Sequence, residues 1–310
     1  MAVPGRVVIS GAGCCTALGH DLDSVARSLR EGRDAFRAST VLEGLAVCPA
    51  DDWGRDEARQ QFEGWRHRHY LNRGSRMALL SGLRALRDAG LEAGLPPRSQ
   101  IVVAVGPMLD VTGEPGLPPQ DTATLGALWL LRWLPNTAAG ALARFCRCHG
   151  EALTVNTACS SALQALGEGW RRIRCGLADA VLVAAGDSRL SLGGLLGYHK
   201  ARALSLCAPG AGPRPFDIDR DGFVPGEGGA AFVLEGLSSA QARGAHVHAE
   251  ILGYGASVDA ESLTAPEARG RWAELAVRGA LEEAGLDAAG LGWLSAHGTG
   301  TQLNDQAEAL

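Results

Sequence analysis

Short apolar runs alternate with segments of helical periodicity along most of the chain. We predict strands over Arg6–Ser10, Ile101–Val105, Leu153–Val155, Asp179–Gly186, Ala230–Glu235, Val247–Tyr254 and Leu291–Ala296. Apolar residues at helical spacing predict helices over Leu22–Leu29, Arg76–Ala89, Ser160–Cys175 and Trp272–Ala284, and a polar helix is expected around Ser238–Arg243. Strands that alternate with helices are typical of α/β folds, and continuously apolar strands indicate a mostly parallel sheet buried on both faces. The pattern therefore predicts an α/β architecture.

The cycle of strands and helices begins twice. The first cycle starts at Arg6 and the second starts at Val247, after a short polar helix. A repeated cycle predicts a duplicated fold, and here the second copy contains fewer elements than the first. We therefore expect an N-terminal half over residues 1–240 and a partial C-terminal half over residues 241–310.

Composition and charge narrow the classes of function. The 310 residues carry a formal net charge of −5, and no run of Lys and Arg reaches the density of a nucleic-acid-binding surface. No apolar stretch reaches the length of about 18 residues that a membrane helix needs, and the first residues lack the pattern of a secretory signal. We therefore expect a cytoplasmic protein with no nucleic-acid or membrane partner.

The chain contains eight cysteines, for which a reducing compartment favours free thiols over a disulfide framework. Cys146 and Cys148, followed by His149, raise the hypothesis of a metal site. Zinc sites usually space paired ligands by about two to four residues and add a second pair, which does not follow here. His246 and His248 face one side of a predicted strand, but they lack a third ligand. The sequence therefore predicts no metal site.

Cys159 lies where a predicted strand passes into a predicted helix, and only small residues flank it. The thiolate is the reactive form of cysteine, and the N-terminal end of a helix favours it through unpaired N–H groups and partial positive charge. Small neighbours allow a sharp turn and the approach of a substrate carbonyl, toward which the N–H of Cys159 can point. The position indicates a nucleophile; taken alone, it also fits a buried cysteine that fills space.

His297 follows a predicted strand and opens a Gly-Thr-Gly-Thr turn. Functional residues concentrate in such loops. A lone histidine of this kind is best interpreted as a surface residue, but a thiol nucleophile requires a neighbouring base or hydrogen-bond donor. Together with Cys159, His297 is therefore a candidate catalytic residue.

Four passages in this sequence resemble a known family. They are Val7-Val-Ile-Ser-Gly-Ala-Gly13, Val155-Asn-Thr-Ala-Cys-Ser-Ser161, Arg214-Pro-Phe-Asp with Arg220-Asp-Gly-Phe-Val-Pro-Gly-Glu-Gly228, and Ala296-His-Gly-Thr-Gly-Thr301 with Asn304, Asp305 and Glu308. In order and spacing they resemble the first strand, the active-site elbow, the central signature and the first catalytic-histidine loop of the β-ketoacyl synthases. The resemblance covers the whole chain. It implies a thiolase-like αβαβα sandwich of two duplicated halves, the second incomplete here, in a homodimer or in a heterodimer with another ketosynthase-like subunit.

The resemblance implies a chemical role for several positions. Cys159 would accept an acyl chain from the phosphopantetheine arm of an acyl carrier protein. His297 would help to decarboxylate a malonyl extender by stabilising the enolate oxygen. Thr299 and Thr301 would hydrogen-bond the amides of the pantetheine arm. No cofactor would be bound, because this arm arrives as the carrier of the substrate.

Other positions are expected to support the site. The resemblance implies structural roles for Asp305 and Glu308, the latter in a buried ion pair with a lysine that comes later in family sequences. Glu227 lies between glycines, and because buried charges are normally paired we predict a buried, hydrogen-bonded carboxylate there. Residues 108–133 would line the dimer interface and an acyl tunnel. The basic stretch 66–76 is expected to be solvated surface or a contact for an acidic carrier protein.

Family sequences continue past the position that matches Leu310. The implied additional part holds a second catalytic histidine, the lysine partner and a loop that completes the oxyanion hole. We predict ketosynthase-type acyl transfer to Cys159, for decarboxylative condensation in fatty-acid or polyketide biosynthesis, with that part or a partner subunit contributing. The alternatives are a cysteine-dependent acyltransferase or thioesterase without condensation, or a non-catalytic partner of a full-length ketosynthase. The presence of Cys159 counts against the last, so an acyltransferase-type enzyme is expected.

Overall fold

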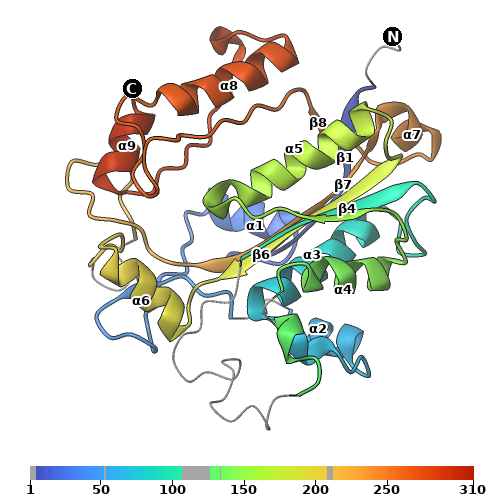
Figure 1. Cartoon of the computed structure of the whole chain (residues 1–310), viewed down its shortest axis with the longest axis horizontal. Helices are drawn as coiled ribbons and strands as arrows, with labels where there is room; N and C mark the ends of the chain where they lie inside the picture. The colour runs from blue at the N-terminus through green and yellow to red at the C-terminus, as the bar shows by residue number, and fades with distance from the viewer. Residues whose placement is uncertain (1–4, 52–53, 107–125, 133, 208–211) are drawn as a thin grey trace. The chain divides into compact units, whose positions relative to one another are not determined.

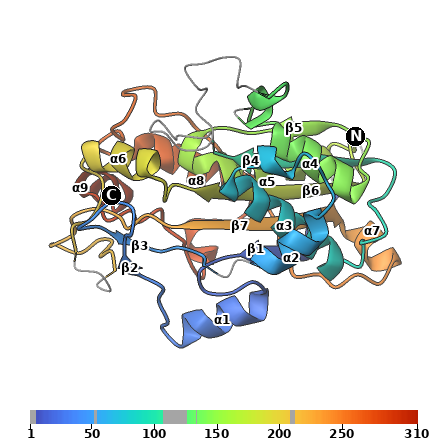
Figure 2. The same cartoon turned by 90° about the horizontal axis from the view of Figure 1, so that it is seen from below.

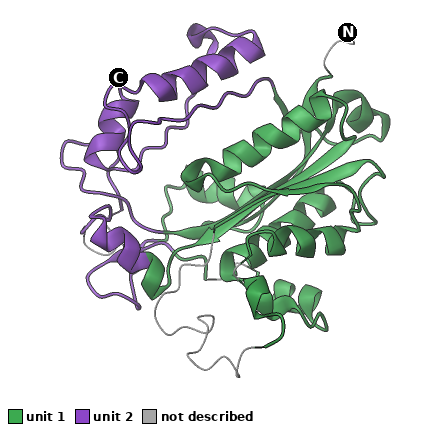
Figure 3. Cartoon of the chain, viewed as in Figure 1, with its two compact units in different colours: residues 1–35, 49–194, 226–251 green, residues 36–48, 195–225, 252–310 purple. Residues whose placement is uncertain are grey.

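The structure of this chain, a computed structural model, describes residues 5–51, 54–106, 126–132, 134–207 and 212–310. Contacts between residues divide the chain into two compact units (Figure 3). Unit 1 comprises residues 1–35, 49–194 and 226–251, and unit 2 comprises residues 36–48, 195–225 and 252–310. Both units are discontinuous in sequence. The division into halves near residue 240 stays a prediction.

Unit 1 is built on a six-stranded sheet with the strand order β5-β4-β6-β7-β1-β8 (Figure 1). The strands are β1 Val7–Cys15, β4 Ser99–Val105, β5 Ala152–Thr154, β6 Ala180–Ser188, β7 Glu227–Gly236 and β8 Ala249–Ile251. β4 pairs in parallel with β5 and β6, whereas β7 is antiparallel to β6 and β1, and β8 is antiparallel to β1. The expectation of a mostly parallel sheet is therefore wrong. An apolar run reports that a strand is buried on both faces, and an antiparallel strand covered by helices on both faces has the same pattern.

Helices cover both faces of this sheet. They are α1 Leu22–Arg30, α2 Arg55–Phe62, α3 Arg73–Asp88, α4 Thr137–Cys146, α5 Ser161–Arg174 and α7 Leu237–Ala242. α3 and α4 lie on one face and α5 lies on the other (Figure 1), and the view from below shows α2, α3 and α4 over the strands (Figure 2). The main apolar core lies between α3, α4 and the sheet, where Met77, Leu142 and Leu182 are fully buried.

Helix α3 approaches the sheet closely because glycines face it. A Cβ atom added to Gly186 of β6 would lie 2.4 Å from the carbonyl oxygen of Gly74 in α3. A Cβ on Gly13 of β1 would lie 2.3 Å from the carbonyl oxygen of Ser81. A side chain at either strand position would push the helix away, so glycine sets the distance between helix and sheet.

Unit 2 contains less regular structure in its described residues. Its elements are β2 Arg37–Ala38, β3 Ala46–Val47, most of α6 Leu192–Lys200, α8 Arg271–Ala284 and α9 Gln302–Glu308. The strand predicted over Val247–Tyr254 is confirmed only over the three residues of β8. The strand predicted over Leu291–Ala296 is wrong: this segment is exposed and forms no strand. A strand needs the N–H and C=O groups of a neighbour, which the described part of unit 2 does not supply there.

Candidate active site

Strand β5 leads directly into the segment that carries Cys159. The N–H of Val155 donates to the carbonyl of Val103 in β4 at 2.9 Å, which keeps the end of this strand on the sheet. The chain then forms a short 3-10 turn over Ala158–Ser160 and continues as the 14-residue helix α5. Cys159 therefore lies at the N-terminal end of a helix and is exposed. The predicted junction of strand and helix is present.

Ala158, directly before Cys159, has a left-handed backbone conformation with φ of 53°. A non-glycine residue adopts this conformation at a cost of about 1–2 kcal/mol, so the surrounding contacts must hold it. The hydroxyl of Ser161 accepts the N–H of Thr157 at 2.7 Å and donates to the carbonyl of Ala158 at 2.7 Å. The hydroxyl of Ser160 donates to the carbonyl of Thr157 at 2.8 Å. Hydrogen bonds from two serines thus stabilise a strained turn at the candidate nucleophile.

Helix α5 is fixed to the rest of unit 1 along its length. A Cβ on Gly169 would lie 2.7 Å from the side chain of Val183, which shows how closely the helix approaches the sheet. The indole N–H of Trp170 donates to the carbonyl of Ile251 at 2.9 Å. Near its C-terminal end, the guanidinium of Arg172 lies 2.7 Å from the carboxylate of Glu151. The helix therefore gives the Cys159 turn a rigid base.

In unit 2, His297 opens a turn whose shape depends on two glycines. Gly298 and Gly300 have φ angles of 51° and 74°. The N–H of Gly222 donates to the carbonyl of Gly300 at 2.9 Å, and a Cβ on Gly300 would lie 2.6 Å from the carbonyl oxygen of Gly222. Glycine accommodates both the positive φ and the close approach. The His297 turn therefore packs against the passage that begins at Arg214.

Asp305 of α9 connects the same two passages. Its carboxylate accepts the N–H of Phe216 at 2.7 Å and the N–H of Gly300 at 3.1 Å. The guanidinium of Arg220 lies 3.8 Å from it. Burial by itself raises the pKa of Asp305, but the hydrogen bonds from Phe216, Asn304 and Gly300, together with the charge of Arg220, hold this pKa below its ordinary value.

Glu308, one turn further along α9, holds His297 through the backbone. Its carboxylate accepts the N–H of His297 at 2.5 Å and the N–H of Gly298 at 2.8 Å. The side-chain amide of Asn304 donates to the same carboxylate at 3.3 Å. The carboxylate therefore has partners within unit 2 and fixes the start of the His297 turn.

Thr299 and Thr301 hydrogen-bond each other. Their hydroxyl oxygens are 2.9 Å apart, and the N–H of Thr301 donates to the hydroxyl of Thr299 at 3.4 Å. Both residues are half-buried. A hydroxyl has one donor and two acceptor positions, so each of these groups keeps the capacity for a further hydrogen bond.

Glu227 belongs to unit 1 and lies in a network that sequence reasoning did not identify. Its carboxylate is 1% exposed and receives both a bidentate ion pair from Arg73, at 2.6 Å for each bond, and the hydroxyl of Ser188 at 2.7 Å. The N–H of Ala50 donates to it at 3.0 Å. Such a carboxylate is fully paired and supports structure. No sequence signal pointed to Arg73, because it lies 154 residues away from Glu227.

The structure therefore groups the candidate residues in two sets. Cys159 and Glu227 belong to unit 1, whereas His297, Thr299, Thr301, Asp305 and Glu308 lie together in unit 2. Within the described ranges, no three His, Cys, Asp or Glu side chains form a group that could hold a metal ion. No helix in those ranges has the length and apolar character required to cross a membrane.

Sequence comparison decides the family. The sequence model of the β-ketoacyl synthase N-terminal domain matches residues 5–240, and that of the C-terminal domain matches residues 248–310. The chain belongs to the β-ketoacyl synthase family. It is 31% identical to 3-oxoacyl-[acyl-carrier-protein] synthase 2 of Vibrio cholerae serotype O1, over 98% of this chain and 75% of the relative. It is accordingly an acyltransferase-type enzyme of fatty-acid or polyketide synthesis.

Two solved ketosynthase structures are similar to this chain. The ishigamide ketosynthase/chain length factor is 32% identical with a TM-score of 0.83, covering 99% of this chain and 76% of that one. The AntDE:AntF complex contains a type II PKS acyl-carrier protein with its ketosynthase bound to the hexaketide. It is 25% identical with a TM-score of 0.80, over 99% of this chain and 76% of that one. The thiolase-like α/β fold expected from the sequence is confirmed.

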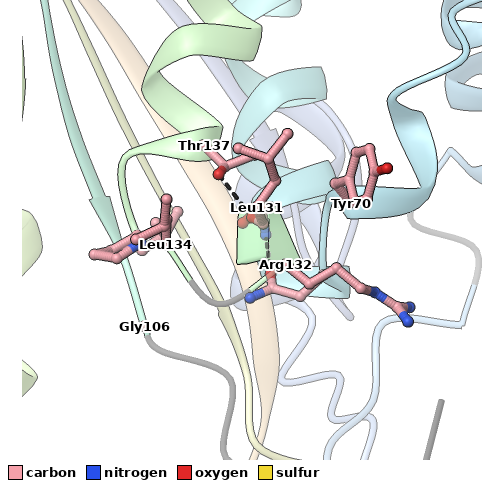
Figure 4. Close-up of a pocket in the computed structure, with 10 residues that line it drawn as sticks. Tyr70, Gly106, Leu131, Arg132, Leu134 and Thr137 are labelled. Carbon is pink, nitrogen blue, oxygen red and sulfur yellow. Dashed lines mark hydrogen bonds between the residues drawn. The ribbon is translucent and has the colours of Figure 1, made fainter. Parts of the chain in front are cut away.

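Residues 108–133, expected from the ketosynthase resemblance to line the acyl tunnel and dimer interface, lie mostly outside the described residues. The described residues at the end of this range border a small pocket in unit 1 beside the end of β4 (Figure 4). Leu131, Arg132, Tyr70 and Gly106 contribute to its lining. The hydroxyl of Thr137 donates to the carbonyl of Leu131 at 2.7 Å and holds one wall. The tunnel and interface roles stay predictions.

Proposed function

We propose that Cys159 of this ketosynthase accepts an acyl group from the phosphopantetheine arm of an acyl carrier protein and holds it as a thioester for condensation with a malonyl extender. The observation that carries this proposal is the strained turn at Ala158, held by serine hydroxyls at the N-terminal end of α5. The Cys159 thiolate attacks the thioester carbonyl, a new C–S bond forms, and the pantetheine thiolate leaves. The N–H of Cys159 supplies one hydrogen bond to the oxyanion.

His297 is the proposed second catalytic group. When the malonyl thioester loses carbon dioxide, negative charge develops on its carbonyl oxygen, and a donor on His297 stabilises that enolate. The hydrogen bonds from the His297 and Gly298 backbone to Glu308 support this role, because they hold the turn from which the side chain extends. The hydroxyls of Thr299 and Thr301 hydrogen-bond the pantetheine amides.

The proposed partner is an acyl carrier protein, which is acidic, and the stretch 66–76 is its proposed contact. Arg66, Arg68 and His69 in this stretch are exposed, whereas Arg73 is engaged by Glu227. The AntDE:AntF complex supports a carrier partner, and the ishigamide ketosynthase/chain length factor supports assembly with a second ketosynthase-like subunit. A homodimer or a heterodimer is thus proposed, and a cytoplasmic location stays a prediction.

Replacing Arg66 and Arg68 with Glu should raise the KM for acyl carrier protein donors, because like charges repel at an encounter surface. The KM for the matching acyl-CoA donor, which brings no protein surface, should stay the same. Loading rates at several donor and salt concentrations measure both values. An equal change for the two donors would place the effect in the active site and contradict the docking surface.

We propose that these 310 residues catalyse condensation only together with a further polypeptide surface, which comes from the same chain or from a partner. Several large apolar side chains of unit 2 support this: Leu275 is 52%, Trp293 82%, Leu294 67% and Leu303 60% exposed. Trp293 and Leu294 are consecutive in the sequence, and exposed apolar residues that lie together mark surfaces that another surface covers. That surface would also supply the remaining oxyanion donor and second histidine.

Intact-mass spectrometry tests the central proposal. Incubation with an acyl carrier protein or acyl-CoA donor should add one acyl group to the wild-type chain and none to Cys159→Ala. Cys175→Ala is the matched control, since Cys175 is also exposed and follows the other end of α5. Loading that persists in Cys159→Ala, or is lost only in Cys175→Ala, contradicts the assignment.

Malonyl carrier protein separates condensation from the alternatives. The acyl-loaded chain, supplemented with its covering polypeptide, should release carbon dioxide and form a product two carbons longer. Hydrolysis of the loaded thioester without carbon dioxide release would indicate the acyltransferase or thioesterase function instead. A chain that neither loads nor hydrolyses but co-purifies with a full-length ketosynthase would indicate a non-catalytic subunit.

A further inference from the structure

The passage from Arg214 to Asp217 forms a tight turn in unit 2. The N–H of Asp217 donates to the carbonyl of Arg214 at 3.2 Å, and Pro215 occupies the second position of the turn. Phe216 occupies the third position and has a φ of 64°. Turns with proline at the second position and a positive φ at the third normally carry glycine or asparagine at the third. An aromatic residue is therefore unexpected at this place.

Burial of the ring does not explain the presence of Phe216. The residue is 47% exposed, so the burial of its ring offsets little of the cost of the left-handed conformation. The backbone of Phe216 is held from outside the turn, because its N–H donates to the buried carboxylate of Asp305 at 2.7 Å. Side-chain residues that are kept in disfavoured conformations cluster at functional sites. We therefore expect the ring to have a function beyond packing.

The ring of Phe216 covers Gly298, the residue directly after His297. A Cβ atom added to Gly298 would lie 3.3 Å from Cε2 of Phe216 and 3.5 Å from Cβ of Pro215. The side of Gly298 on which any other residue carries its side chain therefore faces the ring. Because Asp305 holds the backbone of Phe216, the ring is a fixed neighbour of the His297 turn.

Gly298 is the point in this turn at which the direction of His297 changes most easily. Glycine has the widest choice of backbone conformations, and a rotation at Gly298 turns the preceding peptide group relative to the rest of the turn. The carboxylate of Glu308 accepts the N–H groups of His297 and Gly298 at 2.5 and 2.8 Å. The ring of Phe216 restrains Gly298 by direct contact at its side-chain position. The turn is thus held both by hydrogen bonds and by packing.

We propose that Phe216 is a positioning residue for His297: its ring packs on Gly298 and keeps the imidazole in the direction that decarboxylation of the malonyl thioester requires. This inference rests on the role proposed above for His297. Phe216 acts through the backbone of the turn and takes no part in making or breaking bonds. In the proposed reaction the acyl group reaches Cys159 before His297 acts, so the positioning role concerns only the second half-reaction.

Phe216→Gly tests the proposal, because glycine suits the backbone conformation and removes only the ring. The rate at which Cys159 is loaded from an acyl donor should stay at the wild-type value. The rate of carbon dioxide release from malonyl carrier protein, measured with the covering polypeptide present, should fall by about 10- to 100-fold. Phe216→Asn, which also tolerates a positive φ, should give the same split and serves if the glycine variant does not fold.

Two further variants separate the ring from the loop that carries it. Phe216→Tyr keeps the ring and should release carbon dioxide at nearly the wild-type rate. Ile218→Ala is the matched control, because Ile218 is 87% exposed and lies only two residues further along the chain. It should leave both half-reactions unchanged.

His297→Ala distinguishes a failure of this proposal from a failure of the role proposed for His297. If the wild type releases no carbon dioxide, or if His297→Ala releases it at the wild-type rate, the role of His297 is wrong and the positioning role falls with it. If His297→Ala loses this activity whereas the glycine and asparagine variants of Phe216 keep it, only the positioning role is overturned. An equal fall of loading and decarboxylation in those variants also overturns it, because a general loss of structure acts on both half-reactions.

Discussion

Asp305 and Glu308 act on the His297 turn through backbone hydrogen bonds. Asp305 accepts N–H groups from Phe216 and Gly300, and Glu308 accepts those of His297 and Gly298. A carboxylate that accepts several backbone N–H bonds is stabilised in its charged form. These two side chains on one helix therefore define the conformation of the whole turn, and they do so before any substrate is present.

Asp305→Asn should destabilise the chain, because the amide keeps one acceptor oxygen and leaves a buried N–H without its partner. The expected loss is about 1–3 kcal/mol in the free energy of unfolding, measured by urea denaturation. The pKa of Asp305 is held low in the folded state. Its stabilisation is therefore present above the unfolded-state pKa of about 3.9 and is lost as pH falls through the folded-state pKa.

The stabilities of the wild type and Asp305→Asn should accordingly approach each other in acid. Urea curves at neutral pH and at several pH values below about 4 measure the difference. A difference that stays constant across this range would show that the charge of Asp305 contributes nothing.

Ala158 gives a second prediction for a single residue. Because Ala158 has a positive φ, Ala158→Val should lose at least about 1–2 kcal/mol of stability, since a β-branched side chain crowds the left-handed conformation further. Ala158→Gly relieves that strain but adds about 0.5–1 kcal/mol of unfolded-state entropy, so its stability should be near that of the wild type. Denaturation midpoints of the two variants measure this. Equal destabilisation by valine and glycine would contradict the role assigned to the turn.

At the scale of elements, the spacing between α3 and the sheet depends on glycine. Gly186→Ala would place a methyl group against the backbone of α3 and should cost about 1–3 kcal/mol or more. Gly140→Ala is the matched control, because its Cβ would meet nothing within 4 Å in helix α4. That change should stabilise the chain by about 0.5–1 kcal/mol. Thermal unfolding should therefore give a lower midpoint for Gly186→Ala and a higher midpoint for Gly140→Ala than for the wild type. An unchanged midpoint in Gly186→Ala would contradict the close packing of α3 on the sheet.

The helices with strong apolar periodicity were predictable, and α3, α5 and α8 begin and end within a few residues of the predicted bounds. Helix α4 was missed because Gly140 and its small neighbours weaken the apolar pattern. The apolar segment before His297 was predicted as a strand, but a strand exists only where a second strand pairs with it. Periodicity indicates the secondary structure that a segment tends to form, but it does not indicate which strand, if any, pairs with that segment.

On the scale of the whole molecule, the described part of unit 2 exposes apolar side chains that a covering surface would bury. No residue of α8 is buried, and Trp293 and Leu294 are largely exposed. This distribution differs from α3 in unit 1, where ten residues are buried. The contrast indicates that unit 1 has its own core, whereas unit 2 relies on further contacts.

The 310-residue chain alone should therefore self-associate and bind an apolar dye, and Trp293→Ser with Leu294→Ser should reduce both effects. Leu29→Ser is the control, since Leu29 is 63% exposed in unit 1. Sedimentation at several protein concentrations and dye fluorescence give the measurements. Equal behaviour of the control and the double variant would locate the association elsewhere.

Local sequence determined the Cys159 junction, the periodic helices and the glycine-rich turn at His297, because backbone preference and side-chain size act over neighbouring residues. Only tertiary structure decided the strand directions, the pairing of Glu227 with Arg73 and the hydrogen bond from the N–H of Phe216 to the carboxylate of Asp305. Those contacts join residues 154 and 89 positions apart, and no local preference reaches that far.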